Sequence, residues 1–427
     1  MQSSRIEQRE MNNGDRRGTT AAPQELSWDI FCRVIDNFGD AAVCWRLAEQ
    51  LHSEHGGRVR LWIDRLEALN ALHAAVGIDT DLQRVDGIEV RLWNDRDFGG
   101  GHRTDVGAGA EVADIVIEAF GCGLPASYVE RMAERLPRPL WITLEYLSAE
   151  SWVASHHGLP SPHPSLDVDH YFFFPGYGPA AGGLLREKFL PGRRDEFQSD
   201  PAMAKAFWSG LGFVAPDKSG ITVSLFGYEN PAVDGLLQAW SAGTRPVTVA
   251  VTDSRIRPGV EKWLGLSAMR NGETVRHGAM EMRFLPFLSQ RDYDELLWSC
   301  DWNFVRGEDS FVRAQWAARP LLWHIYPQSE NVHAVKLEAF LDLYCAGLDP
   351  QLSAPLRLLW RHWNGLAGGD GPAEISADSG AIWARLSSPS AAKALMRHAG
   401  DWSKELLLER DLTGKLVDFC QEKRSKA

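Results

Sequence analysis

The chain has 427 residues, enough for two or three domains of ordinary size. Its 45 Lys and Arg against 57 Asp and Glu give a net charge of −12, which argues against a general nucleic-acid-binding protein because such proteins carry basic patches. No segment approaches the roughly 18 apolar residues of a membrane span, the N-terminus lacks the apolar core of a secretory signal, and the six cysteines have no metal-ligand spacing. We therefore expect a cytoplasmic protein with free thiols and no membrane attachment.

Residues 1–24 contain almost no bulky apolar side chain, which predicts a disordered leader. From Trp28 onward, apolar segments alternate with segments of helical periodicity. The predicted strands are 28–35, 58–63, 88–93, 114–119 and 140–144, and helices are predicted after residue 40 and at 65–75 and 125–135. Strands that alternate with helices predict a parallel sheet that is covered on both faces.

This alternation stops between about residues 150 and 215, which are rich in Pro, Gly, His and aromatic residues and are predicted to form long loops. It then resumes and predicts a second α/β domain. The predicted strands there are 221–226, 247–252, 282–285, 302–305 and 321–325, with helices at 231–240, 292–300, 310–318 and 332–343. We expect a leader at 1–24, an N-terminal Rossmann-like domain at 25–190, a C-terminal Rossmann-like domain at 191–385, and a helical tail at 386–427 that packs back on the first domain.

Two acidic residues follow the first predicted strand, where open α/β sheets place their active sites. Asp36 and Asp40 are four residues apart across the turn Asp36-Asn37-Phe38-Gly39-Asp40, in which Gly39 permits a tight turn. Paired carboxylates suit a cationic substrate or general-base catalysis. The alternative is that Asp40 only caps the following helix. We favour the functional interpretation for the pair, and the turn lacks the GxGxxG pattern of a dinucleotide site.

A second candidate site, Arg306-Gly307-Glu308-Asp309-Ser310, joins a predicted strand to a predicted helix. Backbone N–H groups at the start of a helix, together with the helix dipole, bind phosphate well, and Arg306 would neutralise phosphate charge. Helix capping by Asp309 and Ser310 is an equally good interpretation. A phosphate site here requires the carboxylates to point away from the phosphate.

Aromatic residues cluster near the same predicted edge of the second sheet. Rings together with an amide can stack on and hydrogen-bond a nucleobase, although core packing is the alternative for any single ring. The candidates are Phe226, Tyr228, Phe287 and Gln290. Tryptophan is unusually frequent, with 17 residues, and most fall in or beside predicted strands and helices. Trp152, in the predicted loop region, stays a candidate contact for a protein partner.

Two Rossmann-like domains that face each other across a cleft form the GT-B arrangement of sugar-nucleotide glycosyltransferases. Five segments, in the right order, resemble the EarP family, the protein-arginine rhamnosyltransferases of elongation factor P. These segments are Trp28–Asp40 (WDIFCRVIDNFGD), Leu144–Glu150 (LEYLSAE), Gly182–Glu187 (GGLLRE), Phe226–Pro231 (FGYENP) and Arg306–Phe311 (RGEDSF). The resemblance runs from about residue 26 to the C-terminus, and the only departure noted is Ala41-Ala42, where relatives are expected to have Ile-Gly.

The resemblance implies that dTDP-β-L-rhamnose is the donor and that one arginine guanidinium of elongation factor P is the acceptor. The reaction would invert the anomeric carbon in a single displacement, without a metal or cofactor. Asp40 matches the proposed catalytic base, Asp36 a second essential acid and Glu308 an essential glutamate. We expect the donor to contact Asn37, Phe38, Gly39, Phe226, Tyr228, Phe287, Gln290, Arg306, Glu308, Asp309 and Ser310.

Two other functions stay open at this point. The first is a GT-B transferase with a lipid-linked or small-molecule acceptor; the net charge of −12 and the lack of a basic amphipathic segment count against it. The second is a non-catalytic protein that binds a translation factor, which would have no need of a nucleotide pocket.

Overall fold

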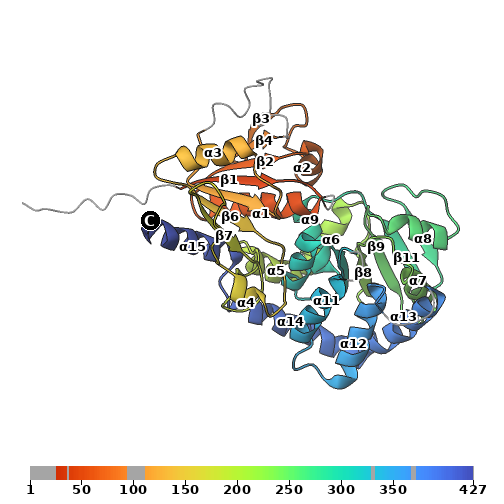
Figure 1. Cartoon of the computed structure of the whole chain (residues 1–427). Helices are drawn as coiled ribbons and strands as arrows, with labels where there is room; N and C mark the ends of the chain where they lie inside the picture. Colours follow the sequence, from red (N-terminus) through yellow and green to blue (C-terminus); the bar gives the residue numbers. More distant parts are fainter. Residues whose placement is uncertain (1–25, 36–37, 94–110, 328–331, 367–371, 427) are drawn as a thin grey trace, which may run out of the picture.

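The computed structural model describes residues 26–35, 38–93, 111–327, 332–366 and 372–426. They form two sheets, each flanked by helices, that lie beside each other in the molecule (Figure 1). The predicted leader at 1–24 lies outside the described residues. None of the helices in the described ranges is long and apolar enough to cross a membrane.

The first sheet has seven strands in the order β3-β4-β2-β1-β5-β6-β7. Its strands are β1 Ser27–Cys32, β2 Arg58–Ile63, β3 Leu82–Val85, β4 Ile88–Leu92, β5 Ile115–Ala119, β6 Leu140–Leu144 and β7 Asp169–Phe173, and its helices include α1 Gly39–Ser53, α2 Leu66–Leu72 and α3 Ala126–Glu134. All neighbours are parallel except β3, which is antiparallel to β4. The chain leaves β1 toward β2 and later returns to β5 on the other side of β1. The carboxyl ends of β1 and β5 therefore form the switch point at which such sheets bind ligands.

The second sheet has six strands in the order β10-β11-β9-β8-β12-β13. Its strands are β8 Ile221–Leu225, β9 Val247–Val251, β10 Thr274–His277, β11 Met280–Phe284, β12 Trp302–Arg306 and β13 Leu321–His324. Its helices are α7 Val233–Ala242, α8 Arg257–Trp263, α9 Gln290–Ser299, α10 Glu308–Trp316, α11 His333–Tyr344, α12 Pro350–Trp363 and α13 Pro372–Leu386. Only β10 is antiparallel to its neighbour. The switch point lies between β8 and β12, and the expected two Rossmann-like domains of a GT-B protein are confirmed.

The structure corrects several local predictions. The region from 150 to 215 is not only loop, because it contains β7, α4 Val153–His156, α5 Leu190–Ser199 and α6 Pro201–Gly210. The antiparallel edge strands β3 and β10 and the helices α8, α12 and α13 are additional to the prediction, and β1 ends at Cys32 rather than at residue 35. Because Arg194 and Gln198 of α5 hydrogen-bond backbone carbonyls of the second domain, we place the division between the domains at the start of this helix.

The C-terminal helices return from the second domain to the first. Helix α14 (Pro389–Leu407) contacts α10 through the hydrogen bond from Trp402 Nε1 to Gln315 Oε1. Helix α15 (Leu412–Lys426) lies below the first sheet in Figure 1, and Leu412, Leu416 and Cys420 are buried in the core of that sheet. The tail thereby fastens the two domains to each other.

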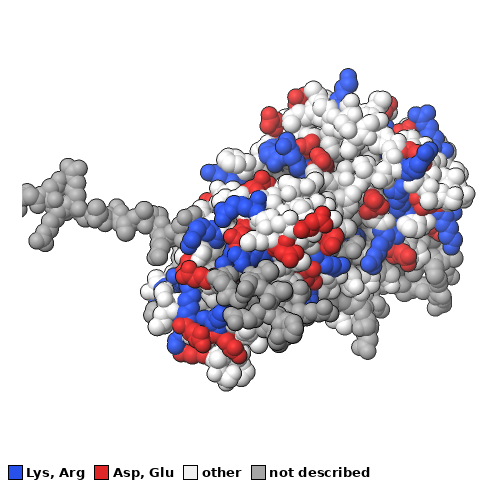
Figure 2. All heavy atoms as spheres, turned by 90° about the horizontal axis from the view of Figure 1, so that it is seen from above, with Lys and Arg blue, Asp and Glu red and all other residues white. Residues whose placement is uncertain are grey.

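Tryptophan is mainly a core residue in this protein. Nine of the largest fully buried side chains are Trp28, Trp45, Trp62, Trp93, Trp208, Trp240, Trp302, Trp360 and Trp363. Trp152 is 39% exposed and stands edge-on to Phe174. On the face shown in Figure 2, Lys and Arg side chains are interspersed with Asp and Glu, so the net charge of −12 is not gathered into one acidic surface there.

Candidate active site

A pocket lies where the carboxyl ends of the two sheets face each other. The space between the atoms that line it, part of which is open to solvent, amounts to about 670 Å³. The first domain supplies Phe38, Gly39, Ala42, Arg46 and Leu72, and the second supplies Phe226, Thr252, Asp253, Pro286, Phe287, Leu288, Gln290, Tyr293 and Arg306 through Ser310. Both domains are thus needed to build the pocket.

Asp40 lies in the first turn of α1, beside the pocket, and is only 3% exposed. Its Oδ2 accepts a hydrogen bond of 2.8 Å from the backbone N–H of Ile35, and its Oδ1 accepts one of 3.2 Å from the Tyr146 hydroxyl. The residue at the helix cap is Phe38, and no side chain caps α1. The interpretation of Asp40 as a helix cap is therefore wrong, and both of its oxygens are held in fixed directions.

The segment Tyr146–Leu147, which follows β6, hydrogen-bonds one carboxylate from each domain, Asp40 and Glu308. The Tyr146 hydroxyl donates to Asp40 of the first domain, while the Leu147 backbone N–H donates to Glu308 Oε2 of the second domain over 2.9 Å. The ring of Tyr146 stacks on Phe120, with centroids 4.4 Å apart. Phe120 itself has a φ of 58°, a left-handed conformation that costs a non-glycine residue energy. The stack therefore holds Tyr146 in a defined place, and through it Asp40.

Glu308 begins α10 and lines the pocket. Its pKa is raised to about 7, mainly by burial and further by the negative charges of Asp40 and Asp309, while Lys336 and the Leu147 N–H act in the opposite direction. A carboxyl with a pKa near neutrality next to a second carboxylate is typical of functional sites. Carboxyl groups placed like those of Glu308 and Asp40 can bind a cation such as a guanidinium.

The start of α10 presents backbone N–H groups to the pocket. Gly307 precedes the helix with a φ of 66°, which only glycine adopts without strain, and no side chain caps the helix. Asp309 points away to Arg46 of the first domain, with its Oδ1 2.9 Å from Arg46 Nε. Capping by Asp309 and Ser310 is therefore not observed. Asp309 is thus paired with Arg46, and Glu308 accepts from the backbone N–H of Leu147, so each carboxylate has a partner within the protein.

Aromatic rings surround Arg306 at the end of β12. The guanidinium carbon lies 4.6 Å from the ring centroid of Phe226 and 4.8 Å from that of Tyr228. Phe226 lines the pocket, whereas Tyr228 is 5% exposed and packs edge-on against His324. Phe226 can thus contact a ligand in the pocket, whereas Tyr228 packs against Arg306 without lining the pocket.

Phe287 and Gln290 contact the first domain. The Phe287 ring stands edge-on to Phe38, with centroids 4.9 Å apart, and Gln290 Nε2 donates to the carbonyl of Ala42 over 3.1 Å. Of the residues expected at the donor, those that line the pocket are Phe38, Gly39, Phe226, Phe287, Gln290, Arg306, Glu308, Asp309 and Ser310. Asp36 and Asn37 lie outside the described residues.

Several residues at this site are absent from the prediction. Arg46, Thr252 and Tyr293 line the pocket, and Tyr146 holds Asp40. Tyr146 lies in Leu144–Glu150, one of the five segments that resemble the EarP family, and that resemblance is the sequence feature that points to it. Within the residues that the structure describes, no group of three or more His, Cys, Asp or Glu is arranged to hold a metal ion.

Known proteins resemble this chain over most of its length. The model of the EarP family, described as elongation-factor P (EF-P) rhamnosyltransferase EarP, matches residues 28–421. The protein-arginine rhamnosyltransferase of Pseudomonas putida is 45% identical over 397 residues, covering 92% of this chain and 98% of the relative. That of Pseudomonas aeruginosa is 44% identical over 396 residues, with the same coverage.

A solved structure is also similar to this chain. It is described as the structural basis for EarP-mediated arginine glycosylation of translation elongation factor EF-P, and it aligns with a TM-score of 0.63 at 34% identity. The alignment covers 93% of this chain and 99% of that one. These matches favour arginine rhamnosylation over the lipid-linked acceptor and the non-catalytic binding protein.

Proposed function

Because this chain belongs to the EarP family of protein-arginine rhamnosyltransferases, we propose that it transfers L-rhamnose from dTDP-β-L-rhamnose to one arginine side chain of elongation factor P. The observation that carries the proposal is the arrangement around Tyr146–Leu147. This segment holds Asp40 and Glu308, from different domains, beside one pocket that both domains build. A cationic acceptor and an anionic donor can therefore meet there.

The donor would occupy the pocket on the side of the second domain. Phe226 would stack on the thymine base. The diphosphate would lie at the start of α10, where backbone N–H groups, the helix dipole and Ser310 favour negative charge. Arg306, at the end of the neighbouring strand, would add a positive charge. These groups would stabilise the leaving dTDP, so the proposed reaction needs no metal.

The acceptor guanidinium has a pKa above about 12, so a carboxylate does not deprotonate it in the ground state. Asp40 and Glu308 would instead bind and orient the cation. As one guanidinium nitrogen attacks the anomeric carbon, the new C–N bond forms while the C–O bond to dTDP breaks. Asp40 accepts the proton that this nitrogen releases. Attack opposite to the leaving group inverts the anomeric carbon.

The proposal is tested by incubating the protein with dTDP-β-L-rhamnose and purified elongation factor P and measuring the intact mass of the acceptor. We expect a gain of one deoxyhexose, on a single arginine identified by fragmentation. The matched control is the same mixture without the donor. An unchanged mass with a folded acceptor would defeat the proposal.

A further inference from the structure

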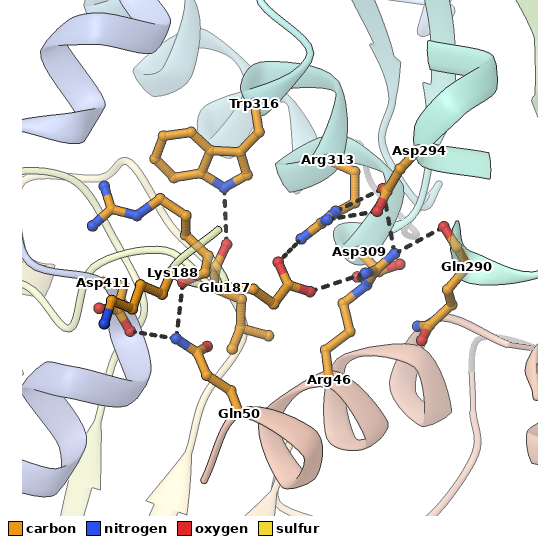
Figure 3. Close-up of polar contacts among 12 residues, drawn as sticks. Arg46, Gln50, Glu187, Lys188, Gln290, Asp294, Asp309, Arg313, Trp316 and Asp411 are labelled. Atoms are coloured by element: carbon orange, nitrogen blue, oxygen red, sulfur yellow. Dashed lines mark hydrogen bonds and ion pairs between the residues drawn. The ribbon is translucent and has the colours of Figure 1, made fainter. Parts of the chain in front are cut away.

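A buried network of charges joins the two domains behind the pocket (Figure 3). Arg46 of α1 pairs with Asp309 of α10, and its Nη1 lies 3.1 Å from Glu187 Oε1 in the segment that connects the domains. Arg313 binds the other oxygen of Glu187 at 2.5 Å and makes a two-point contact with Asp294 at 2.8 and 2.6 Å. Two guanidinium groups thus face three carboxylates. Of the two guanidinium groups, that of Arg46 comes from the first domain and that of Arg313 from the second.

Arg46 is placed to affect the start of α10. Its side chain is 5% exposed, it lines the pocket, and it reaches Asp309 in the first turn of the helix. Without Arg46, the positive charge of Arg313 would be the one left in this network to balance three carboxylates, those of Asp309, Asp294 and Glu187. The excess negative charge would then lie beside the backbone groups that are proposed to receive a diphosphate, where it would repel an anion.

The same residue is linked to the acceptor side. Arg46 lies six positions after Asp40 on α1, and its Nη2 also lies 3.5 Å from the carbonyl oxygen of Gln290 at the start of α9. One side chain of the helix that carries Asp40 therefore contacts both helices of the second domain that border the pocket.

We propose that Arg46 is a positioning residue for the donor, which neutralises Asp309 so that the start of α10 accepts the diphosphate and which holds α10 against α1. This inference rests on the proposed function in taking dTDP as the leaving group. The alternative is that the network only stabilises the interface between the domains. Buried ion pairs are weak evidence of net stability, and only the positioning role makes donor affinity depend on the balance between Arg46 and Asp309.

The test compares the affinity for dTDP, measured by calorimetry, of the parent and three variants. R46M retains the apolar stem and removes the charge, and we expect it to weaken dTDP binding on the order of tenfold to a hundredfold. D309N removes the carboxylate and should bind dTDP at least as tightly as the parent. The double variant R46M/D309N restores the charge balance, and we expect it to regain most of the lost affinity.

The control is R60M, because Arg60 also makes a two-point contact with a buried carboxylate, Asp29, at 2.5 Å, within the first sheet. R60M should lower the melting temperature without changing the dTDP affinity. If R46M fails to fold, D309N and the double variant carry the test. D309N must then bind dTDP at least as tightly as the parent, and the double variant must bind it within about threefold of the parent.

Three outcomes would overturn the role of Arg46. They are a folded R46M that binds dTDP like the parent, a double variant as weak as R46M, and an equal loss in R60M. A parent that does not bind dTDP would defeat the proposed function as well, whereas a parent that binds dTDP and rhamnosylates its acceptor leaves the proposed function intact whatever the variants show.

Discussion

The raised pKa of Glu308 predicts that this residue lowers the stability of the protein above neutral pH. The pKa rises from an ordinary 4.5 to about 7 in the folded chain, mainly through burial. The folded state then holds the proton more tightly than the unfolded state does. The stabilising contribution of this carboxyl is fully present below about pH 4.5 and is lost as the pH rises through about 7.

The size of the effect follows from the shift. At about 1.4 kcal/mol per pKa unit, the rise corresponds to about 3 kcal/mol above pH 8. Glu308 is partly exposed to the pocket, and solvent there reduces this figure. In Glu308→Gln, the side chain no longer titrates, but its amide nitrogen needs a partner. We therefore expect the variant to be more stable than the parent by about 1 to 2 kcal/mol at pH 8.5, with little advantage at pH 4.5.

The assay is thermal unfolding of both proteins between pH 4.5 and 8.5. We expect the melting temperature of Glu308→Gln to exceed that of the parent by a few degrees at the alkaline end and the two curves to converge toward the acid end. Glu130→Gln, at an exposed position on α3, is the matched control and should follow the parent throughout. Parallel curves for the parent and Glu308→Gln across the whole range would refute the reasoning.

Three further predictions concern catalysis. Asp40→Asn should retain dTDP affinity in calorimetry but lose transfer in the intact-mass assay, because the amide cannot accept the proton; turnover like that of the parent would exclude Asp40 as the base. Tyr146→Phe removes the hydroxyl that donates to Asp40, and kcat should fall about tenfold while the KM for dTDP-β-L-rhamnose stays constant; a change confined to that KM would contradict the positioning of Asp40. Phe226→Ala should weaken dTDP binding by about tenfold to a hundredfold with its melting temperature as the check on folding, and unaltered affinity would exclude stacking on this ring.

Both sheets could be predicted from the sequence because their central strands are mainly apolar and fully buried. Ile115–Ala119 contains one polar residue, Glu118, and Ile221–Leu225 contains two, Thr222 and Ser224. The edge strands lack this signal. Leu82–Val85 and Thr274–His277 are mostly exposed or half-buried, and Asp169–Phe173 lies within a region rich in Pro and His. An edge strand is stabilised by its neighbour in the sheet, which the local pattern does not reveal.

The pocket is partly predictable for a similar reason. The rule that ligands bind at the carboxyl ends of parallel strands locates Phe226, Arg306 and Glu308 from local patterns alone. The pairing of Arg46 with Asp309 joins residues 263 positions apart, and neither has a sequence neighbour that indicates the other. Such a contact depends on how the two folded domains pack against each other, and local sequence patterns do not indicate that packing.

The return of α15 to the first sheet determines the order in which the enzyme is completed on the ribosome. Leu412, Leu416 and Cys420 belong to the core of the first domain but are synthesised after the entire second domain. Domains generally fold as they emerge, from the N-terminus onward. We therefore expect the nascent first domain to keep an uncovered apolar surface until α15 has emerged, so that the domain carrying Asp40 reaches its final form only after α15 has been synthesised.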